Sequence, residues 1–174
     1  LWSRGLGDVY KRQEQSPSYI QVACLLNGYE PPLATPSFSY CELGCGQGAT
    51  ALTIAAANPA ARVVAIDFNP AQIARARRTA REAQLTNIEF LELSFEELSR
   101  RKDLIDFDLV TLHGVWSWVS QENRENIVAF LKNGVKAGGA VSLSYNSMPG
   151  WTNILASQRM MMEHASLTSE RSDR

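Results

Sequence analysis

Short apolar runs alternate with amphipathic segments along most of the chain. There are five such runs, and several are rich in Val, Ile, Leu and Phe, as is typical of strands buried on both faces of a parallel sheet. They cover residues 38–43, 62–67, 87–93, 106–112 and 139–145. Segments of helical periodicity lie between them, at residues 48–58, 70–84, 95–101 and 121–134. This alternation predicts an α/β fold, a Rossmann-like doubly wound parallel sheet with right-handed crossovers.

Local signals support these boundaries. Asn69 is a good N-cap residue, and Pro70 follows it at the first helical position of the second segment. Ser120 can cap the fourth segment, and Gly138-Gly139 is expected to form the turn into the fifth strand.

The two ends of the chain differ from its centre. Residues 1–13 lack any periodicity and resemble a translated sequencing adapter, so we expect a non-native leader there. Residues 14–37 predict an N-terminal helix, from Ser18 to Tyr29, and a proline-rich linker. Residues 38–165 then form the main domain, and residues 166–174 read as a truncated polar tail.

Composition and charge exclude several classes of protein. With 17 Lys+Arg and 18 Asp+Glu, the net charge of −1 argues against nucleic acid or anionic lipid as a partner. The most apolar stretch, residues 49–57, is far shorter than the roughly 20 residues that a membrane span needs. The three cysteines lack the spacing of a zinc site, so we expect no metal and a cytoplasmic protein with reduced thiols.

A glycine-rich turn follows the first predicted strand. The segment reads Glu42-Leu43-Gly44-Cys45-Gly46-Gln47-Gly48-Ala49. Its glycines allow a tight turn and a close approach of the backbone to a ligand. Asp67 ends the second predicted strand, where a carboxylate can accept hydrogen bonds from both ribose hydroxyls of an adenosine-containing cofactor.

Two cofactors fit this arrangement, because the turn also satisfies the dinucleotide fingerprint G-x-G-x-x-G/A. Glu42 distinguishes between them, since a carboxylate two residues before the first glycine would repel a pyrophosphate. S-adenosylmethionine has no phosphate and carries a sulfonium and an ammonium, which suit an acidic turn. The sequence therefore favours S-adenosylmethionine over NAD.

The pattern Glu42-x-Gly44-x-Gly46-x-Gly48 resembles the first motif of class I S-adenosylmethionine-dependent methyltransferases. Four segments in order, 40–48, 65–77, 112–120 and 144–151, are similar to bacterial methyltransferases that carry a separate methyltransferase regulatory domain. The resemblance implies the strand order 3-2-1-4-5-7-6. This chain supplies the first five strands, so we expect a catalytic-domain fragment with order 3-2-1-4-5 that lacks its C-terminal regulatory domain.

The resemblance also implies a set of cofactor-binding residues. They are Glu42, Gly44, Cys45, Gly46, Gly48, Asp67, Phe68, Asn69, Ser94, Phe95 and His113. Glu42 and the glycine turn would face the methionine half, Asp67 the ribose, and Phe68 and Asn69 the adenosine. Asn69 is equally explained as a helix cap. His113 has two alternative roles, lining the cofactor pocket or packing in the interior.

The methyl acceptor and the catalytic residue are not identified by the sequence. Tyr145 is the candidate for orienting an acceptor, and Trp116 and Trp118 form either an aromatic wall or a hydrophobic cover. The acceptor is a protein side chain or a small molecule. Two alternatives to the methyltransferase stay open: a non-catalytic S-adenosylmethionine-binding module and an NAD-dependent oxidoreductase.

Overall fold

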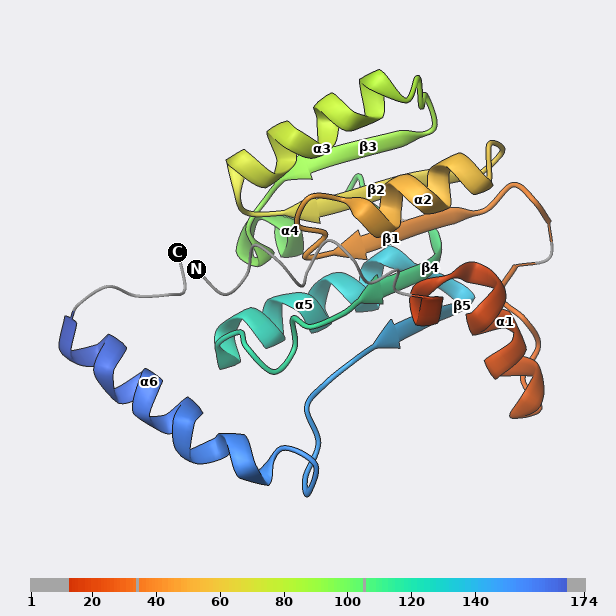
Figure 1. Ribbon diagram of the computed structural model, residues 1–174. Helices are drawn as coiled ribbons and strands as arrows, with labels where there is room; N and C mark the ends of the chain where they lie inside the picture. The colour runs from red at the N-terminus through yellow and green to blue at the C-terminus, as the bar shows by residue number, and fades with distance from the viewer. Residues whose placement is uncertain (1–12, 34, 105, 169–174) are drawn as a thin grey trace.

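The computed structural model describes residues 13–33, 35–104 and 106–168. Most of the predicted leader, and residues 169–174 of the predicted tail, lie outside these ranges. Five parallel strands form one sheet in the order β3-β2-β1-β4-β5 (Figure 1). They span Ser39–Leu43 (β1), Arg62–Asp67 (β2), Ile88–Glu92 (β3), Phe107–Leu112 (β4) and Val135–Leu143 (β5). The predicted fold class and strand order are confirmed.

Helices connect successive strands and cover both faces of the sheet, while the last helix extends away from the sheet (Figure 1). They span Pro17–Leu26 (α1), Ala49–Ala57 (α2), Pro70–Glu82 (α3), Phe95–Arg100 (α4), Gln121–Gly134 (α5) and Leu155–Thr168 (α6), with short 3₁₀ turns at Gln13–Gln15 (η1) and Thr152–Ile154 (η2). Because successive strand residues point to opposite faces, Tyr40 packs with α2 and α3 whereas Cys41 packs with α4 and α5.

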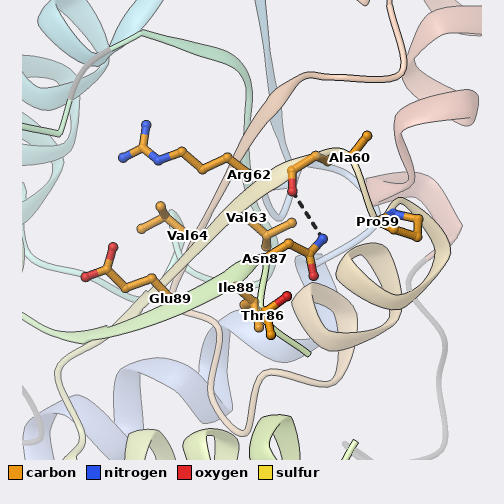
Figure 2. Close-up of a pocket in the computed structure, with 10 residues that line it drawn as sticks. Pro59, Ala60, Arg62, Val63, Val64, Thr86, Asn87, Ile88 and Glu89 are labelled. Carbon is orange, nitrogen blue, oxygen red and sulfur yellow. Dashed lines mark hydrogen bonds between the residues drawn. The ribbon is translucent and has the colours of Figure 1, made fainter. Parts of the chain in front are cut away.

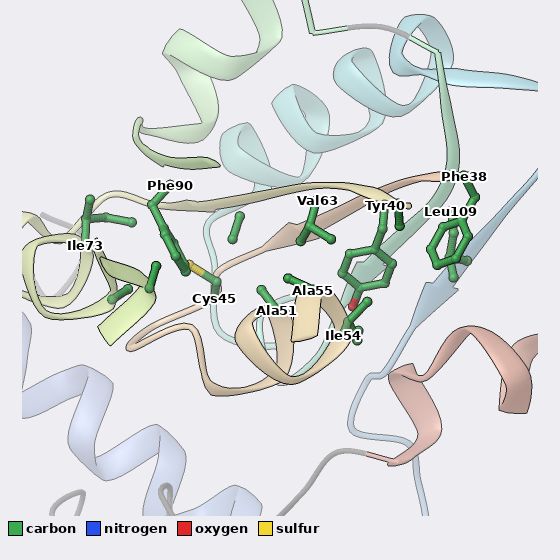
Figure 3. Close-up of a cluster of buried hydrophobic side chains, with 14 of the residues drawn as sticks. Phe38, Tyr40, Cys45, Ala51, Ile54, Ala55, Val63, Ile73, Phe90 and Leu109 are labelled. Atoms are coloured by element: carbon green, nitrogen blue, oxygen red, sulfur yellow. The ribbon is translucent and has the colours of Figure 1, made fainter. Parts of the chain in front are cut away.

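The core consists of two clusters, one on each face. Figure 3 shows the first, in which Tyr40, Val63 and Phe90 from the strands meet Ala51 and other small residues of α2. The second joins strand residues to Leu98 of α4 and to Ile127 and Phe130 of α5. All five residues of β1 are buried, as expected for the central strand.

The fifth strand differs from the expectation. It begins at Val135, before the two glycines that were predicted to form a turn ahead of it, and it ends at Leu143. Phe107 pairs with Val135 but Leu109 pairs with Ala140, so three extra residues of β5 are accommodated beside β4. Gly138, with φ of 81°, supplies the left-handed conformation that such an irregularity needs. The glycines interrupt the register inside the strand rather than preceding the strand.

Candidate functional site

The glycine-rich turn lies at the carboxyl end of β1 and is fastened to the end of β2. The backbone N–H groups of Gly44 and Cys45 both donate to the Ile66 carbonyl, at 2.8 and 3.0 Å. Gly46 N–H donates to the Asp67 carboxylate at 2.8 Å. The ends of two neighbouring parallel strands are thus joined at the edge where open α/β sheets bind ligands.

The three glycines of the turn serve different purposes. Each has a positive φ, between 54° and 75°. A Cβ on Gly44 would lie 2.5 Å from Val115, and one on Gly48 would lie 2.5 Å from the Phe90 ring. A Cβ on Gly46 would meet no atom within 4 Å. Gly44 and Gly48 are therefore required by packing, while Gly46 leaves open space in which a ligand can approach the backbone.

Asp67 organises the mouth of this turn. One carboxylate oxygen accepts from Gly46 N–H, and the other accepts from Asn69 N–H at 2.9 Å. A carboxylate has about four acceptor positions, so two remain for donors from a ligand. The side chain is partly exposed, and those positions are compatible with the two hydroxyls of a ribose.

Glu42 lies beneath the turn, only 5% exposed. Its carboxyl accepts from Ala51 N–H in the first turn of α2 at 3.1 Å. Burial raises the pKa of Glu42 to about 8, hydrogen bonds from Ala51 N–H and from the Gln15 and Thr50 side chains oppose that rise, and the Asp67 carboxylate adds to it. Burial disfavours the ionised form of this carboxyl, so a cationic partner such as an ammonium group would stabilise it strongly.

Gln15 was not expected at this site from the sequence. This residue belongs to η1, lies far from the turn in sequence, and is 3% exposed. Its amide nitrogen donates to Thr111 Oγ1 at 3.3 Å, and its carbonyl accepts from Thr50 Oγ1 at 3.4 Å. A carboxylate oxygen of the preceding residue, Glu14, lies 3.5 Å from His113 Nδ1. No local signal marks a lone glutamine near a chain end as buried, so only tertiary structure identifies it.

Four predicted cofactor contacts follow β2 and β3. Phe68 is 53% exposed beside Asp67. Asn69 caps α3 by accepting from the N–H groups at positions 71 and 72, which confirms its role as a helix cap. Ser94 caps α4 in a capping box with Glu97, and Phe95 packs partly against the second core cluster. These residues occupy the expected edge, and their contact with a cofactor stays a prediction.

The Cys45 side chain faces the interior rather than the mouth. It is buried in the first core cluster, where Figure 3 shows it beside Phe90. Burial raises the pKa of its thiol, with further contributions from Glu42 and Asp67. Any contact of Cys45 with a ligand therefore has to involve its backbone.

The segments after β4 and β5 bring aromatic side chains together. Trp118 and Trp151 meet edge to face with ring centroids 5.9 Å apart, and Trp118 is 53% exposed. Trp116 packs partly against the second core cluster, with the Arg124 guanidinium 5.9 Å from its ring centroid. Tyr145 lies two residues beyond the end of β5 and is 64% exposed. Trp118 and Tyr145 thus remain accessible, while Trp116 belongs largely to the cover.

A separate groove lies at the opposite edge of the sheet. Figure 2 shows this groove, of about 400 Å³, at the amino ends of β2 and β3, with Arg62, Asn87 and Glu89 on its lining. The Asn87 amide donates to the carbonyls of Ala55, Asn58 and Ala61. That amide holds the α2–β2 connection, so this polar group of the groove is engaged in structure.

Comparison with known proteins agrees with the geometry. Residues 41–139 match the model of a family described as a methyltransferase domain. The uncharacterized protein sll1526 of Synechocystis is 39% identical over 90% of this chain, and the uncharacterized protein RP028 of Rickettsia prowazekii is 30% identical over 86%. The chain spans 31% and 58% of the lengths of these two relatives.

A solved structure is similar over nearly the whole chain. PKMT2 from Rickettsia typhi, determined in complex with AdoHcy, superimposes with a TM-score of 0.80 at 29% identity. The match covers 95% of this chain and 31% of PKMT2. Within the described ranges of the present chain, no helix is both long enough and apolar enough to cross a membrane.

Proposed function

Since the chain belongs to the family of class I methyltransferase domains, we propose that it binds S-adenosylmethionine at the carboxyl edge of its sheet and transfers the methyl group to a protein side chain or a small molecule. The observation that carries the proposal is the hydrogen bond from Gly46 N–H to Asp67. It brings an open stretch of backbone and a carboxylate with spare acceptor positions to the same mouth.

The residues present fit the cofactor in three places. Open space over Gly46 admits it, Asp67 has acceptors for its ribose, and Glu42 gains from its ammonium group. Ser94 Oγ accepts from Glu97 N–H and donates to the Glu97 carboxylate, so one lone pair is left for an adenine amine. When bound, S-adenosylmethionine supplies an electrophilic methyl group on a sulfonium.

The acceptor side of the mouth is formed by the segments after β4 and β5. Ser144 N–H donates to the Leu112 carbonyl, and Ser144 Oγ accepts from Gly114 N–H at 2.9 Å, so the two segments leave the sheet together. Trp118 and Tyr145 are exposed there and are available to hold an acceptor. Holding a nucleophile about 3–3.5 Å from the methyl carbon is the main contribution that such residues can make.

The wider setting of this activity belongs to the same proposal. We propose a cytoplasmic location and a functional partnership with further sequence of the longer chains to which the relatives belong. The greater length of those relatives supports the second part.

A thermal melt of the chain tests the proposal. S-adenosylhomocysteine at 100 times its dissociation constant adds about 2.7 kcal/mol of stability, which raises Tm by roughly 5–10 °C in a domain of this size. NAD serves as the matched control and is expected to leave Tm unchanged. A cooperative melt that responds only to NAD, or to neither ligand, would contradict the proposal.

Acceptor classes are separated by a second assay. The chain is incubated with S-adenosylmethionine labelled on its methyl group and with bacterial extract divided into protein and small-molecule fractions. Label is expected in one fraction, and the fraction that carries it identifies the acceptor class. Heat-treated chain is the control for transfer by enzymes already in the extract.

A further inference from the structure

We propose that Ser117 is a positioning residue for the methyl acceptor, because its hydroxyl joins the segments after β4 and β5 and so fixes Trp118 and Tyr145 as one wall of the mouth. This inference rests on the proposed function and deepens it on the acceptor side. It starts from the place of one hydrogen bond, which joins the direct neighbours of the two exposed aromatic residues.

Two serine hydroxyls join these segments in a reciprocal way. Ser117 lies on the segment after β4, and its Oγ accepts from Asn146 N–H at 2.7 Å. Ser144 lies on the segment after β5, and its Oγ accepts from Gly114 N–H at 2.9 Å. Each segment thus supplies one side-chain oxygen and one backbone N–H to the other, and the pairing of β4 with β5 continues beyond the end of the sheet.

The Ser117 hydrogen bond acts at the point where the two aromatic side chains leave the backbone. Ser117 directly precedes Trp118, and Asn146 directly follows Tyr145. Trp118 is 53% exposed and Tyr145 is 64% exposed, so the position of each ring depends strongly on its backbone. A bond between their neighbours therefore fixes how far apart the two rings can lie.

The far end of the segment after β5 is attached to the same turn. Trp151 meets Trp118 edge to face, with ring centroids 5.9 Å apart. Trp118 N–H donates to the Val115 carbonyl at 2.9 Å, which closes a turn that contains Ser117. The stretch between the two attachments, residues 147–150, is exposed. One turn after β4 therefore sets the course of the whole segment that borders the mouth.

The two serine bonds act on different sides of the mouth. Gly114, the partner of Ser144, directly follows His113, which the sequence places at the cofactor pocket. The bond of Ser117 lies beyond it, beside the residues available to a methyl acceptor. A displacement of roughly 1 Å at a reacting centre can lower a rate on the order of 100-fold. Loss of the Ser117 bond should therefore slow methyl transfer while leaving cofactor binding intact.

The test removes one hydroxyl from each of two serines. Ser117→Ala deletes the oxygen that accepts from Asn146 N–H, and Ser147→Ala, the matched control, deletes a hydroxyl at an exposed position of the segment after β5. Affinity for S-adenosylhomocysteine is measured by isothermal titration calorimetry. The initial rate of transfer is measured with saturating methyl-labelled S-adenosylmethionine and with the extract fraction that the wild type labels. Hydrogen exchange of residues 144–148 reports on the bond itself.

Ser117→Ala is expected to lower the initial rate about tenfold, to leave the affinity for S-adenosylhomocysteine unchanged and to speed exchange at residue 146. Ser147→Ala is expected to match the wild type in all three measurements. Ser117→Thr keeps a hydroxyl and should restore transfer, which ties the loss to the hydrogen bond. If Ser117→Ala does not fold, Ser117→Cys replaces it, because a thiol is similar in shape but accepts hydrogen bonds only weakly.

The outcomes separate the two proposals. Transfer at the wild-type rate in Ser117→Ala, unchanged exchange at residue 146, or an equal loss of affinity for S-adenosylhomocysteine overturns the role of Ser117 and leaves the proposed function standing. A wild-type chain that does not bind S-adenosylhomocysteine, or that labels neither fraction, overturns the proposed function and this inference with it.

Discussion

Asp67 and Glu42 are two carboxyl groups at one edge of the sheet with opposite surroundings. Asp67 is partly exposed and accepts two backbone N–H groups, which leaves it ready to accept from hydroxyls. Glu42 is buried and carries a raised pKa of about 8. The difference in burial assigns the two groups to different ligand chemistries, hydroxyl donors for Asp67 and a cation for Glu42.

Glu42 should make the stability of the ligand-free chain depend on pH. Its pKa in the fold is raised above the ordinary value of 4.5. Between about pH 4.5 and pH 8 the folded chain therefore holds a proton that the unfolded chain has lost, so stability falls as pH rises through this window. Glu42→Gln removes the titrating group, so this contribution to the pH dependence of stability is absent from the variant.

Urea denaturation at pH 5 and pH 8 measures this effect. The wild type is expected to lose a few kcal/mol more than Glu42→Gln between the two pH values. An equal loss in both proteins, or a gain in the wild type, would show that Glu42 is ionised in the fold without cost.

Sequence reasoning identified some of these residues and missed others for a physical reason. The glycine turn and Asp67 are recognisable because a turn between strand and helix imposes local backbone requirements that glycine meets. Gln15 is not recognisable, because its burial depends on contacts 35 and 96 residues away in sequence, with Thr50 and Thr111. The burial of Glu42 follows from its place in the central strand, but the hydrogen bond that its carboxyl accepts from Ala51 N–H on α2 is visible only in the structure.

Among the elements, the close contact of α2, α3 and β3 depends on Gly48. This residue precedes α2 with φ of 75°, and a Cβ there would lie 2.5 Å from Phe90 and 3.2 Å from Ala76. Phe90 is buried in the first core cluster, so its ring has little room to move.

Gly48→Ala is expected to destabilise the chain by about 2–5 kcal/mol, the sum of a left-handed backbone and an overpacked core. Gly28→Ala is the matched control, because Gly28 has nearly the same φ of 77° but no atom lies within 4 Å of the place its added methyl group would take. It should cost only about 1–2 kcal/mol. Chemical denaturation measures both, and equal losses would show that Phe90 yields to the added methyl group.

Element types were predictable because strands and helices differ in hydrophobic period. The caps at Asn69 and Ser120 and the central strands appear close to their predicted positions. The start of β5 was not predictable, since a pair of glycines fits both a turn and an irregularity inside a strand. Only pairing with β4 decides between them.

The whole molecule offers two edges of one sheet to a ligand. The amino edge carries a groove of about 400 Å³ that includes Glu89 (Figure 2). The carboxyl edge carries the glycine turn, Asp67 and Glu42. The groove gives the amino edge a hollow that a ligand could enter. The carboxyl edge offers accessible backbone at Gly46 and free acceptor positions on Asp67, and the proposed function depends on the carboxyl edge.

Titration of S-adenosylhomocysteine into the wild type, Asp67→Ala and Glu89→Ala by calorimetry distinguishes the two edges. Both variants remove one carboxylate, at the carboxyl and the amino edge respectively. We expect Asp67→Ala to weaken binding roughly 30- to 150-fold, as the loss of two hydrogen bonds implies, and Glu89→Ala to bind as the wild type does. Unchanged affinity in Asp67→Ala, or a loss confined to Glu89→Ala, would contradict a cofactor site at the carboxyl edge.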